Sequence, residues 1–209
     1  MKDWDDIYKD KGMVQVEPSK YVINALNYFK KEKLSKILDL GCGTGRHVAY
    51  MNNQGFSVSG CDASTKALEI ASKNTPQAKL IYCDFKSLPY PDESFDGVIS
   101  HGVVHHALMD DIRKAISEIK RVVRSGGLVY IMVPSINHDE FHTGTEIEKN
   151  TKINIDSIDG DLPHHYFAKN ELEDLFDDFE IIKLEHVSYP SEKHKEKTAS
   201  GFVVYAKKH

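Results

Sequence analysis

Short apolar runs alternate with amphipathic segments along most of this chain. The runs at residues 36–40, 56–61, 78–82, 95–100 and 128–133 are typical of short buried strands. The clearest amphipathic segment carries Ile112, Ile116, Ile119 and Val123 at i, i+4, i+7 and i+11. It predicts a helix that Asp110 or Asp111 caps and Gly126 ends. Repeated strand-then-helix units predict a parallel sheet with right-handed crossovers.

The two ends of the chain add further elements to this sheet. Residues 19–31 predict an extra N-terminal helix, and residues 170–179 predict a late one. Two strands, at 180–187 and 201–207, are expected to form a hairpin that adds an antiparallel strand. The sequence therefore predicts one α/β domain over residues 1–209, doubly wound around a mostly parallel seven-stranded sheet with an antiparallel C-terminal strand.

Composition narrows the class of protein. The 209 residues are 40% hydrophobic and 28% charged, which is ordinary for a globular domain. A net charge of −5 argues against the broad basic surface of non-specific nucleic-acid binding. No apolar run approaches 18 residues, and the N-terminus is acidic, so neither a membrane span nor a signal peptide is expected.

The three cysteines, Cys42, Cys61 and Cys83, form no CxxC pair. They therefore predict neither a disulfide framework nor a zinc site. This pattern favours the reducing cytoplasm as the location of the protein.

A glycine-rich loop follows the first strand and opens a helix. It contains Asp39, Gly41, Cys42, Gly43 and Gly45. Glycines at such a turn let the backbone approach a ligand closely. The spacing is GxGxG rather than the GxGxxG that holds a dinucleotide pyrophosphate. Asp39 would repel a pyrophosphate but attract an ammonium group, so the loop favours S-adenosylmethionine over NAD.

This loop, together with residues 88–96 and 120–127, resembles the class I S-adenosylmethionine-dependent methyltransferases, and the similarity covers roughly residues 36–134. The resemblance implies methyl transfer from S-adenosylmethionine, with S-adenosylhomocysteine as the product. It also implies that Asp62 accepts hydrogen bonds from the ribose hydroxyls. Asp84 would accept one from the adenine amine, and the backbone of Phe85 would meet the ring edge.

Residues outside the loop are also expected at the cofactor. Trp4–Tyr8 resembles the WDxxY opening of small-molecule methyltransferases, so the arm and helix at 1–33 would close over the cofactor, with Tyr8 against the sulfonium. Arg46 would pair with the methionine carboxylate or lie solvated on the helix surface. The predicted cofactor-binding set is Tyr8, Asp39, Gly41, Cys42, Gly43, Gly45, Arg46, Asp62, Asp84, Phe85 and His101.

Histidines supply the candidates for chemistry. His105 and His106 follow the fourth strand, where a neutral imidazole could take a proton from the acceptor. The alternative is that they form part of the packed wall, because methyl transfer can proceed by alignment alone. The polar, histidine-rich insertion at 135–167 is expected to cover the acceptor pocket. His138 and His142, at i and i+4, could hold a metal if helical, but we expect no metal site.

Two absent motifs bear on the acceptor. The amino-methylating Asn-Pro-Pro-Tyr or Asp-Pro-Pro-Tyr motif does not follow the fourth strand, and no Pro-Cys nucleophile occurs. A small-molecule acceptor is therefore expected and no membrane partner, while a nucleic-acid acceptor is disfavoured but stays open. A tRNA-modifying enzyme is the first alternative, since residues 101–127 also resemble that branch. A non-catalytic cofactor-binding subunit and a nicotinamide oxidoreductase are the others.

Overall fold

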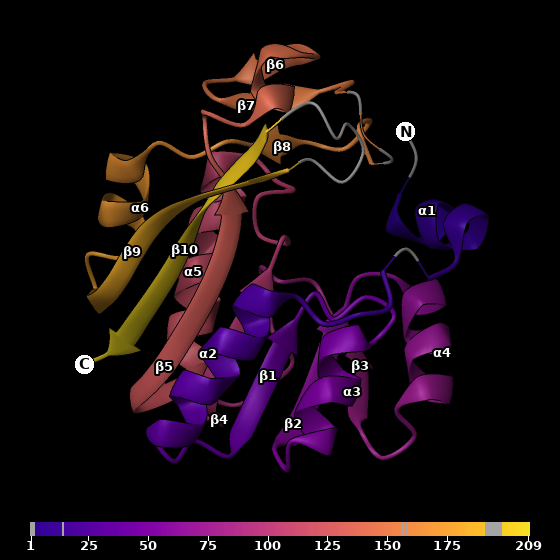
Figure 1. Cartoon of the computed structure of the whole chain (residues 1–209), viewed down its shortest axis with the longest axis vertical. Helices are drawn as coiled ribbons and strands as arrows, with labels where there is room; N and C mark the ends of the chain where they lie inside the picture. Colours follow the sequence, from indigo (N-terminus) through magenta and orange to yellow (C-terminus); the bar gives the residue numbers. More distant parts are fainter. Residues whose placement is uncertain (1–2, 14, 156, 158, 191–197) are drawn as a thin grey trace.

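A computed structural model of the chain describes residues 3–13, 15–155, 157, 159–190 and 198–209 (Figure 1). The helices are α1 Trp4–Lys11, α2 Lys20–Lys31, α3 Arg46–Asn53, α4 Thr65–Asn74, α5 Met109–Val122 and α6 Lys169–Leu175. The strands of the large sheet are β1 Lys36–Leu40, β2 Ser57–Asp62, β3 Lys79–Tyr82, β4 Phe95–His101, β5 Val123–Pro134, β9 Phe179–Pro190 and β10 Thr198–Lys208. None of the described helices is long and apolar enough to cross a lipid bilayer.

The large sheet has the strand order β3-β2-β1-β4-β5-β10-β9. The first five strands in this order pair in parallel, while β10 runs antiparallel to both β5 and β9. Strand order reverses between β1 and β4, because the chain returns to the centre of the sheet after β3. The fold class predicted from the sequence is confirmed.

Helices cover both faces of this sheet (Figure 1). On one face, α2 and α3 bury side chains that include Leu26, Phe29 and Met51. On the other face, α5 and α6 bury side chains that include Ile112 and Leu172. Removing such apolar surface from water contributes about 25 cal/mol per Å², and this term holds the layers together.

Helix α5 differs from the prediction at both ends. Its N-cap is Leu108, which makes no side-chain capping bond, and the carboxylate of Glu148 accepts a hydrogen bond from the Met109 backbone N–H at 2.9 Å. Neither Asp110 nor Asp111 is the cap. The helix ends at Val122 and passes directly into β5, so Gly126 lies within that strand, with a φ of 72°. Strand β5 already pairs with β4 at Val123, whereas the position of Gly126 predicted that the strand starts after this glycine.

The cysteine prediction is wrong. Cys61, in β2, and Cys83, directly after β3, form a disulfide with their Cα atoms 5.6 Å apart. The two strands are parallel neighbours, with Asp62 beside Tyr82. A separation of 22 residues carries no pairing signal in the sequence, because only the crossover through α4 brings the two thiols together. Cys42 is buried and remains a free thiol.

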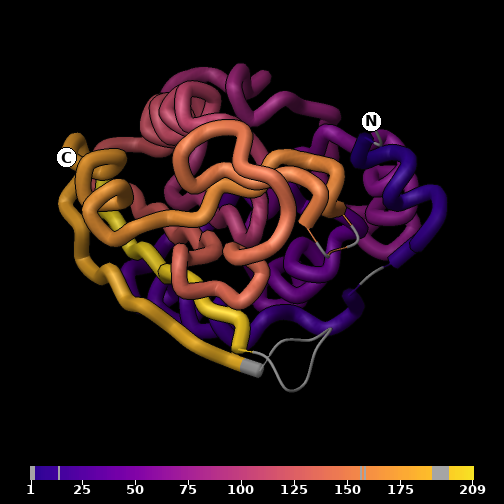
Figure 2. Tube along the Cα trace, turned by 90° about the horizontal axis from the view of Figure 1, so that it is seen from above, coloured from indigo at the N-terminus to yellow at the C-terminus, as the bar shows by residue number. Residues whose placement is uncertain are grey.

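Residues 135–167 form more regular structure than predicted. They contain the short 3₁₀ helix η1 Asp139–His142 and the strands β6 Thr145–Glu148, β7 Thr151–Ile153 and β8 His164–His165 of a small three-stranded antiparallel sheet. Seen from above, this segment lies over the carboxyl ends of the central strands (Figure 2). The His165 backbone N–H donates to the His105 carbonyl at 2.8 Å, which fastens β8 to the loop after β4.

Candidate functional site

A cavity of about 380 Å³ opens at the carboxyl ends of β1, β2 and β4. It lies at the point where strand order reverses, which is where open α/β sheets bind their ligands. Most of the predicted site residues line it. From the glycine loop and α1 these are Tyr8, Gly41, Cys42, Gly43 and Arg46, and from the later strands they are Asp62, Phe85, His101, His105 and His106.

Three predicted residues lie outside the lining. Asp39 and Gly45 flank the glycine loop within the protein, and Asp39 is 1% exposed. The Asp84 side chain is 54% exposed, accepts a hydrogen bond from the Lys86 backbone at 2.9 Å and pairs with the Lys86 ammonium at 3.6 Å. The structure therefore does not bring Asp84 together with the other candidates.

The glycine loop adopts backbone conformations that favour glycine. Gly41, Gly43 and Gly45 have φ values of 72°, 52° and 87°. A Cβ on Gly43 would lie 2.8 Å from the Tyr8 hydroxyl, so the loop and α1 approach each other closely. The Asp62 carboxylate accepts hydrogen bonds from the backbone N–H groups of Gly43, at 2.7 Å, and Ser64, at 2.9 Å. Asp62 thereby fixes the loop against the start of α4.

The Asp39 carboxylate lies beneath this loop, and one of its two oxygens lacks a hydrogen-bond partner among the described residues. Its Oδ2 atom is buried without a hydrogen-bond partner in the described part of the chain. Burial raises the pKa of Asp39 to about 7, although the nearby Arg46 guanidinium acts in the opposite direction. An unpaired buried polar atom costs free energy that a cationic ligand group would recover.

Helix α1 lies across one side of the cavity because Asp5 anchors it. The Asp5 carboxylate accepts hydrogen bonds from the hydroxyls of Ser64, at 2.6 Å, and Thr65, at 2.8 Å. It also accepts one from the Lys66 backbone at 3.0 Å, so it satisfies the first turn of α4. Burial raises the pKa of Tyr8, which lines the cavity from this helix.

Two further contacts tie the N-terminal region to the cavity. The Arg46 guanidinium donates to the Glu17 carbonyl at 3.2 Å, which holds the segment between α1 and α2. The ring of Trp4 meets the ring of His106 edge to face, with centroids 4.8 Å apart.

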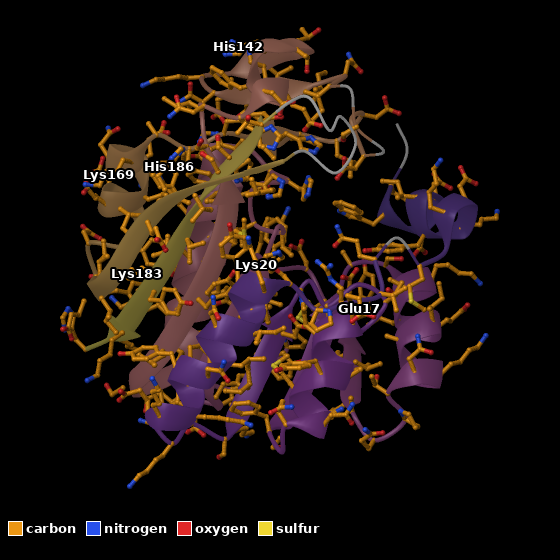
Figure 3. All side chains as sticks on the ribbon, viewed as in Figure 1. Glu17, Lys20, His142, Lys169, Lys183 and His186 are labelled. Carbon is orange, nitrogen blue, oxygen red and sulfur yellow. A yellow bond between two sulfur atoms is a disulfide. The ribbon has the colours of Figure 1, made fainter. Side chains whose placement is uncertain are left out.

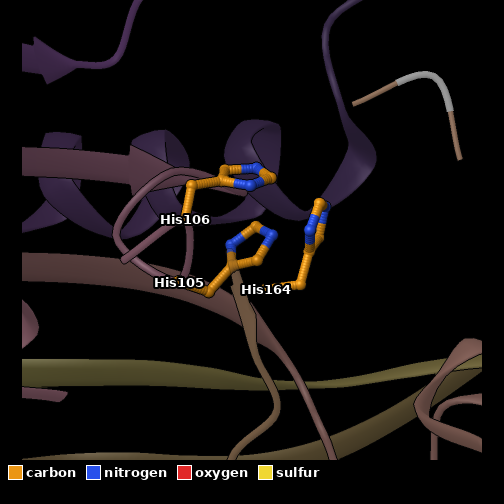
Figure 4. A group of neighbouring side chains, drawn as sticks. All are labelled: His105, His106 and His164. Carbon is orange, nitrogen blue, oxygen red and sulfur yellow. The ribbon is translucent and has the colours of Figure 1, made fainter. Parts of the chain in front are cut away.

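Three imidazoles, those of His105, His106 and His164, lie together (Figure 4), and the first two line this cavity. Ring centroids are 3.8 Å apart for His105 and His106 and 4.5 Å apart for His106 and His164. The Asp159 carboxylate lies 3.7 Å from Nε2 of His106 and 3.4 Å from Nε2 of His164. Burial lowers the pKa of His106 to about 3.

His101 belongs to a separate polar chain behind the glycine loop. Its Nδ1 lies 3.0 Å from the Tyr130 hydroxyl, and its ring meets that of His47 at a centroid distance of 5.3 Å. Nε2 of His47 accepts a hydrogen bond from the Ser19 backbone at 3.3 Å. Burial lowers the pKa of His101 to about 3, so both imidazoles are neutral at pH 7 and serve as hydrogen-bonding wall groups.

A second cavity, of about 210 Å³, adjoins the first. The two share His101, Gly102, His105 and Asp159, and the second is also lined by residues of the 135–167 segment, among them His138, Glu140, His164 and Tyr166. His138 caps η1 by accepting a hydrogen bond from the Glu140 backbone at 3.2 Å, and His142 is exposed. These two histidines belong to no potential metal group within the described ranges.

The sequence placed His164 in the insertion expected to cover the acceptor pocket, but it did not predict that His164 or Asp159 lies beside His105 and His106. The adjacent pair His164 and His165 was visible in the sequence, but nothing local linked it to His105. Asp159 carries no motif. Only the attachment of β8 to the loop after β4 brings both residues to the histidines.

Comparison with known proteins shows what the central part of the chain is similar to. The family described as "Methyltransferase domain" matches residues 38–131. The human protein "Probable tRNA methyltransferase 9B" is 39% identical over 109 residues, which are 52% of this chain and 23% of that protein. An "O-methyltransferase" from Pyrenophora dematioidea is 30% identical over 136 residues, 61% of this chain and 50% of that protein. The chain thus matches about a quarter to a half of these relatives.

A solved structure extends the likeness to the whole fold. The crystal structure of a SAM-dependent methyltransferase from Methanosarcina mazei superimposes with a TM-score of 0.77 and covers 92% of this chain and 98% of its own. Its sequence identity is 22%. The sheet order and the glycine loop at the end of β1 agree with this fold, and residues 38–131 of the chain match the methyltransferase domain family.

Proposed function

We propose that the protein transfers the methyl group of S-adenosylmethionine to a small-molecule acceptor. The observation that carries this proposal is the pair of adjoining cavities at the carboxyl edge of the sheet. The larger one is formed around the glycine loop, and the smaller one is covered by the 135–167 segment. A cofactor in the first and an acceptor in the second would meet beside His105, which lines both.

The residues around the first cavity fit the chemistry of the cofactor. The unpartnered Asp39 oxygen suits the ammonium of its amino-acid end, and Arg46 suits the carboxylate. Asp62 would hold the ribose, Phe85 would contact the adenine, and the Tyr8 ring would face the sulfonium. When bound, S-adenosylmethionine supplies an electrophilic methyl group on a positively charged sulfur.

The chain itself would contribute orientation and shielding. Helix α1 and the 135–167 segment flank the two cavities, which lets them exclude water from the reacting groups. Holding an acceptor in line with the methyl group supplies much of the acceleration, because it removes the entropy cost of a bimolecular encounter. His105 and His106 line the first cavity, where a neutral imidazole nitrogen of either would be placed to take a proton from the acceptor.

Calorimetry with S-adenosylhomocysteine and with NAD tests the cofactor assignment. We expect S-adenosylhomocysteine to bind the purified protein with a micromolar dissociation constant and NAD not to compete. The physical reason is the GxGxG loop above the buried Asp39 carboxylate, which attracts an ammonium and repels a pyrophosphate. Tighter binding of NAD than of S-adenosylhomocysteine would contradict the proposal.

The affinity for S-adenosylhomocysteine should also depend on pH through Asp39. Its pKa is raised to about 7, so the carboxylate is ionised above pH 7 and increasingly protonated below it. Attraction for the ligand ammonium is therefore present at pH 8 and lost as the pH falls, by about tenfold between pH 8 and pH 6. Asp39→Asn should bind more weakly at pH 8 and lose this dependence. If the affinity of Asp39→Asn changed with pH as much as that of the wild type, the titrating group would be a residue other than Asp39.

A tRNA acceptor is the second candidate, because the human relative is named a probable tRNA methyltransferase. The net charge of −5 disfavours it, since tRNA binding rests on contacts between basic side chains and phosphates. Supplying labelled S-adenosylmethionine to the protein with total tRNA, and separately with a small-molecule extract, distinguishes the two acceptors. Turnover of neither would favour the non-catalytic binding subunit.

A cytoplasmic location stays a prediction. The argument for it from the cysteines is weakened by the disulfide between Cys61 and Cys83.

A further inference from the structure

We propose that His105, His106 and His164, with Asp159 beside them, form a binding site for a divalent transition-metal ion of the Zn²⁺ type. The site stands at the junction of the two cavities. The binding of the ion is independent of the proposed methyl transfer, whereas its action on an acceptor rests on that function.

The spacing of the three imidazoles is the first reason. One ring nitrogen from each of them lies within 4.8 Å of the others. Ligand nitrogens around one tetrahedral Zn²⁺ are about 3.4 Å apart, because each Zn–N bond is about 2.1 Å. The cluster therefore needs to contract by at most about 1.4 Å, which small rotations of the imidazole rings provide.

The orientation of His164 is the second reason. Its Nδ1 lies 2.9 Å from the Leu162 carbonyl, to which it can only donate, so in the neutral ring Nε2 carries a lone pair. Nε2 lies 3.4 Å from the Asp159 carboxylate, so a cation near both atoms would have a nitrogen and an oxygen donor within reach. Metal-binding histidines commonly donate their other N–H to a backbone carbonyl in this way.

The buried, unpaired nitrogens of the other two histidines are the third reason. Nδ1 of His105 and Nδ1 of His106 have no hydrogen-bond partner in the described part of the molecule. The His106 side chain is only 6% exposed. Leaving several polar nitrogens unpaired inside one cluster is unfavourable, because each has lost its hydrogen bonds to water. Coordination to a common ion offers a partner to such nitrogens.

The fold holds the remaining parts in place. The hydrogen bond from the His165 backbone to the His105 carbonyl fixes the distance between β8 and the loop after β4. The Ser157 hydroxyl donates to Oδ1 of Asp159, which orients the carboxylate toward the imidazoles. Both supports come from the backbone or a short side chain, so the cluster is prearranged.

The donor set indicates the kind of ion and of acceptor. Imidazole nitrogens with one carboxylate nearby suit Zn²⁺ and similar first-row ions rather than Mg²⁺ or Ca²⁺. Three protein ligands leave a coordination position open to the cavities, which is the arrangement of catalytic zinc sites. An ion there lowers the pKa of an oxygen or sulfur bound to it. We therefore infer an acceptor that carries a hydroxyl or thiol group.

Calorimetric titration of the chelator-treated full chain with ZnCl₂ tests the site. We expect one ion per chain with a micromolar or lower dissociation constant, and Co²⁺ absorption bands typical of nitrogen ligation. His164→Ala should weaken Zn²⁺ binding at least about tenfold, because even an outer partner of a metal ligand contributes that much. The matched control is His142→Ala, since His142 is exposed at the outer end of the 135–167 segment (Figure 3).

Absence of Zn²⁺ binding by the wild type, or an equal loss in His142→Ala, would overturn the proposal. Asp159→Asn serves as the second variant should His164→Ala not fold, which its circular dichroism reveals. It should weaken Zn²⁺ binding while keeping the three imidazoles. S-adenosylhomocysteine binding is measured on the same samples. A protein that binds S-adenosylhomocysteine but no Zn²⁺ contradicts the metal site alone, and one that binds Zn²⁺ but not S-adenosylhomocysteine contradicts the proposed function alone.

Discussion

Asp62→Ala should bind S-adenosylhomocysteine about 5- to 150-fold more weakly than the wild type, a loss of roughly 1–3 kcal/mol. The substitution removes the acceptor of the Gly43 and Ser64 backbone N–H groups. It also removes the proposed acceptor for the ribose hydroxyls of the ligand. Calorimetry measures the dissociation constant, and thermal melting of the same variant separates lost binding from lost stability.

Two further variants sharpen this test. Asp62→Asn keeps one acceptor oxygen and should lie between wild type and Asp62→Ala. Asp174→Ala removes an exposed carboxylate from α6, on the opposite face of the sheet from α3, and should leave the affinity unchanged. An unchanged dissociation constant in Asp62→Ala would show that this carboxylate only holds the loop and the start of α4.

The fold could be predicted well because its elements depend on local pattern. The apolar run of β1 is buried at Leu38 and Leu40, as expected for a central parallel strand. Ser64 caps α4 through a hydrogen bond from the Ala67 backbone, as its position indicates. The end of α5 was harder, because Val123 satisfies both the helical pattern and strand pairing. Tertiary pairing with β4 decides in favour of the strand.

Only those site residues that directly follow the predicted strands could be placed from the sequence. The glycine loop and Asp62 follow consecutive strands, so motif and strand order place them together. His164 and Asp159 reach the site through the small sheet of residues 135–167. The strand pairing of this sheet cannot be predicted from the hydrophobic periodicity of the sequence. Cys61 and Cys83 were missed for the same reason, since their contact depends on the neighbouring registers of β2 and β3. Long-range contacts that depend on strand register or on the 135–167 segment thus escaped sequence reasoning.

Gly41→Ala should lower stability by about 2–5 kcal/mol and weaken S-adenosylhomocysteine binding more than a hundredfold. Gly41 has a φ of 72°, a conformation that costs an alanine about 1–2 kcal/mol. Its added Cβ would overlap both methyl groups of Val103, and such overpacking costs about 1–3 kcal/mol more. Val103 lines the larger cavity and lies in the loop that leads to His105. The displaced loop would therefore disturb the cofactor and acceptor sides together.

Gly55→Ala is the matched control for this substitution. Gly55 has a φ of 86°, and no atom lies within 4 Å of an added Cβ, so this variant carries the backbone strain without the overlap. It should lose only about 1–2 kcal/mol of stability and keep its affinity for S-adenosylhomocysteine. Thermal melting and calorimetry on both variants measure the difference. Equal losses in the two would mean that the loop yields to the added methyl group, and that the close approach of Gly41 to Val103 does not shape the site.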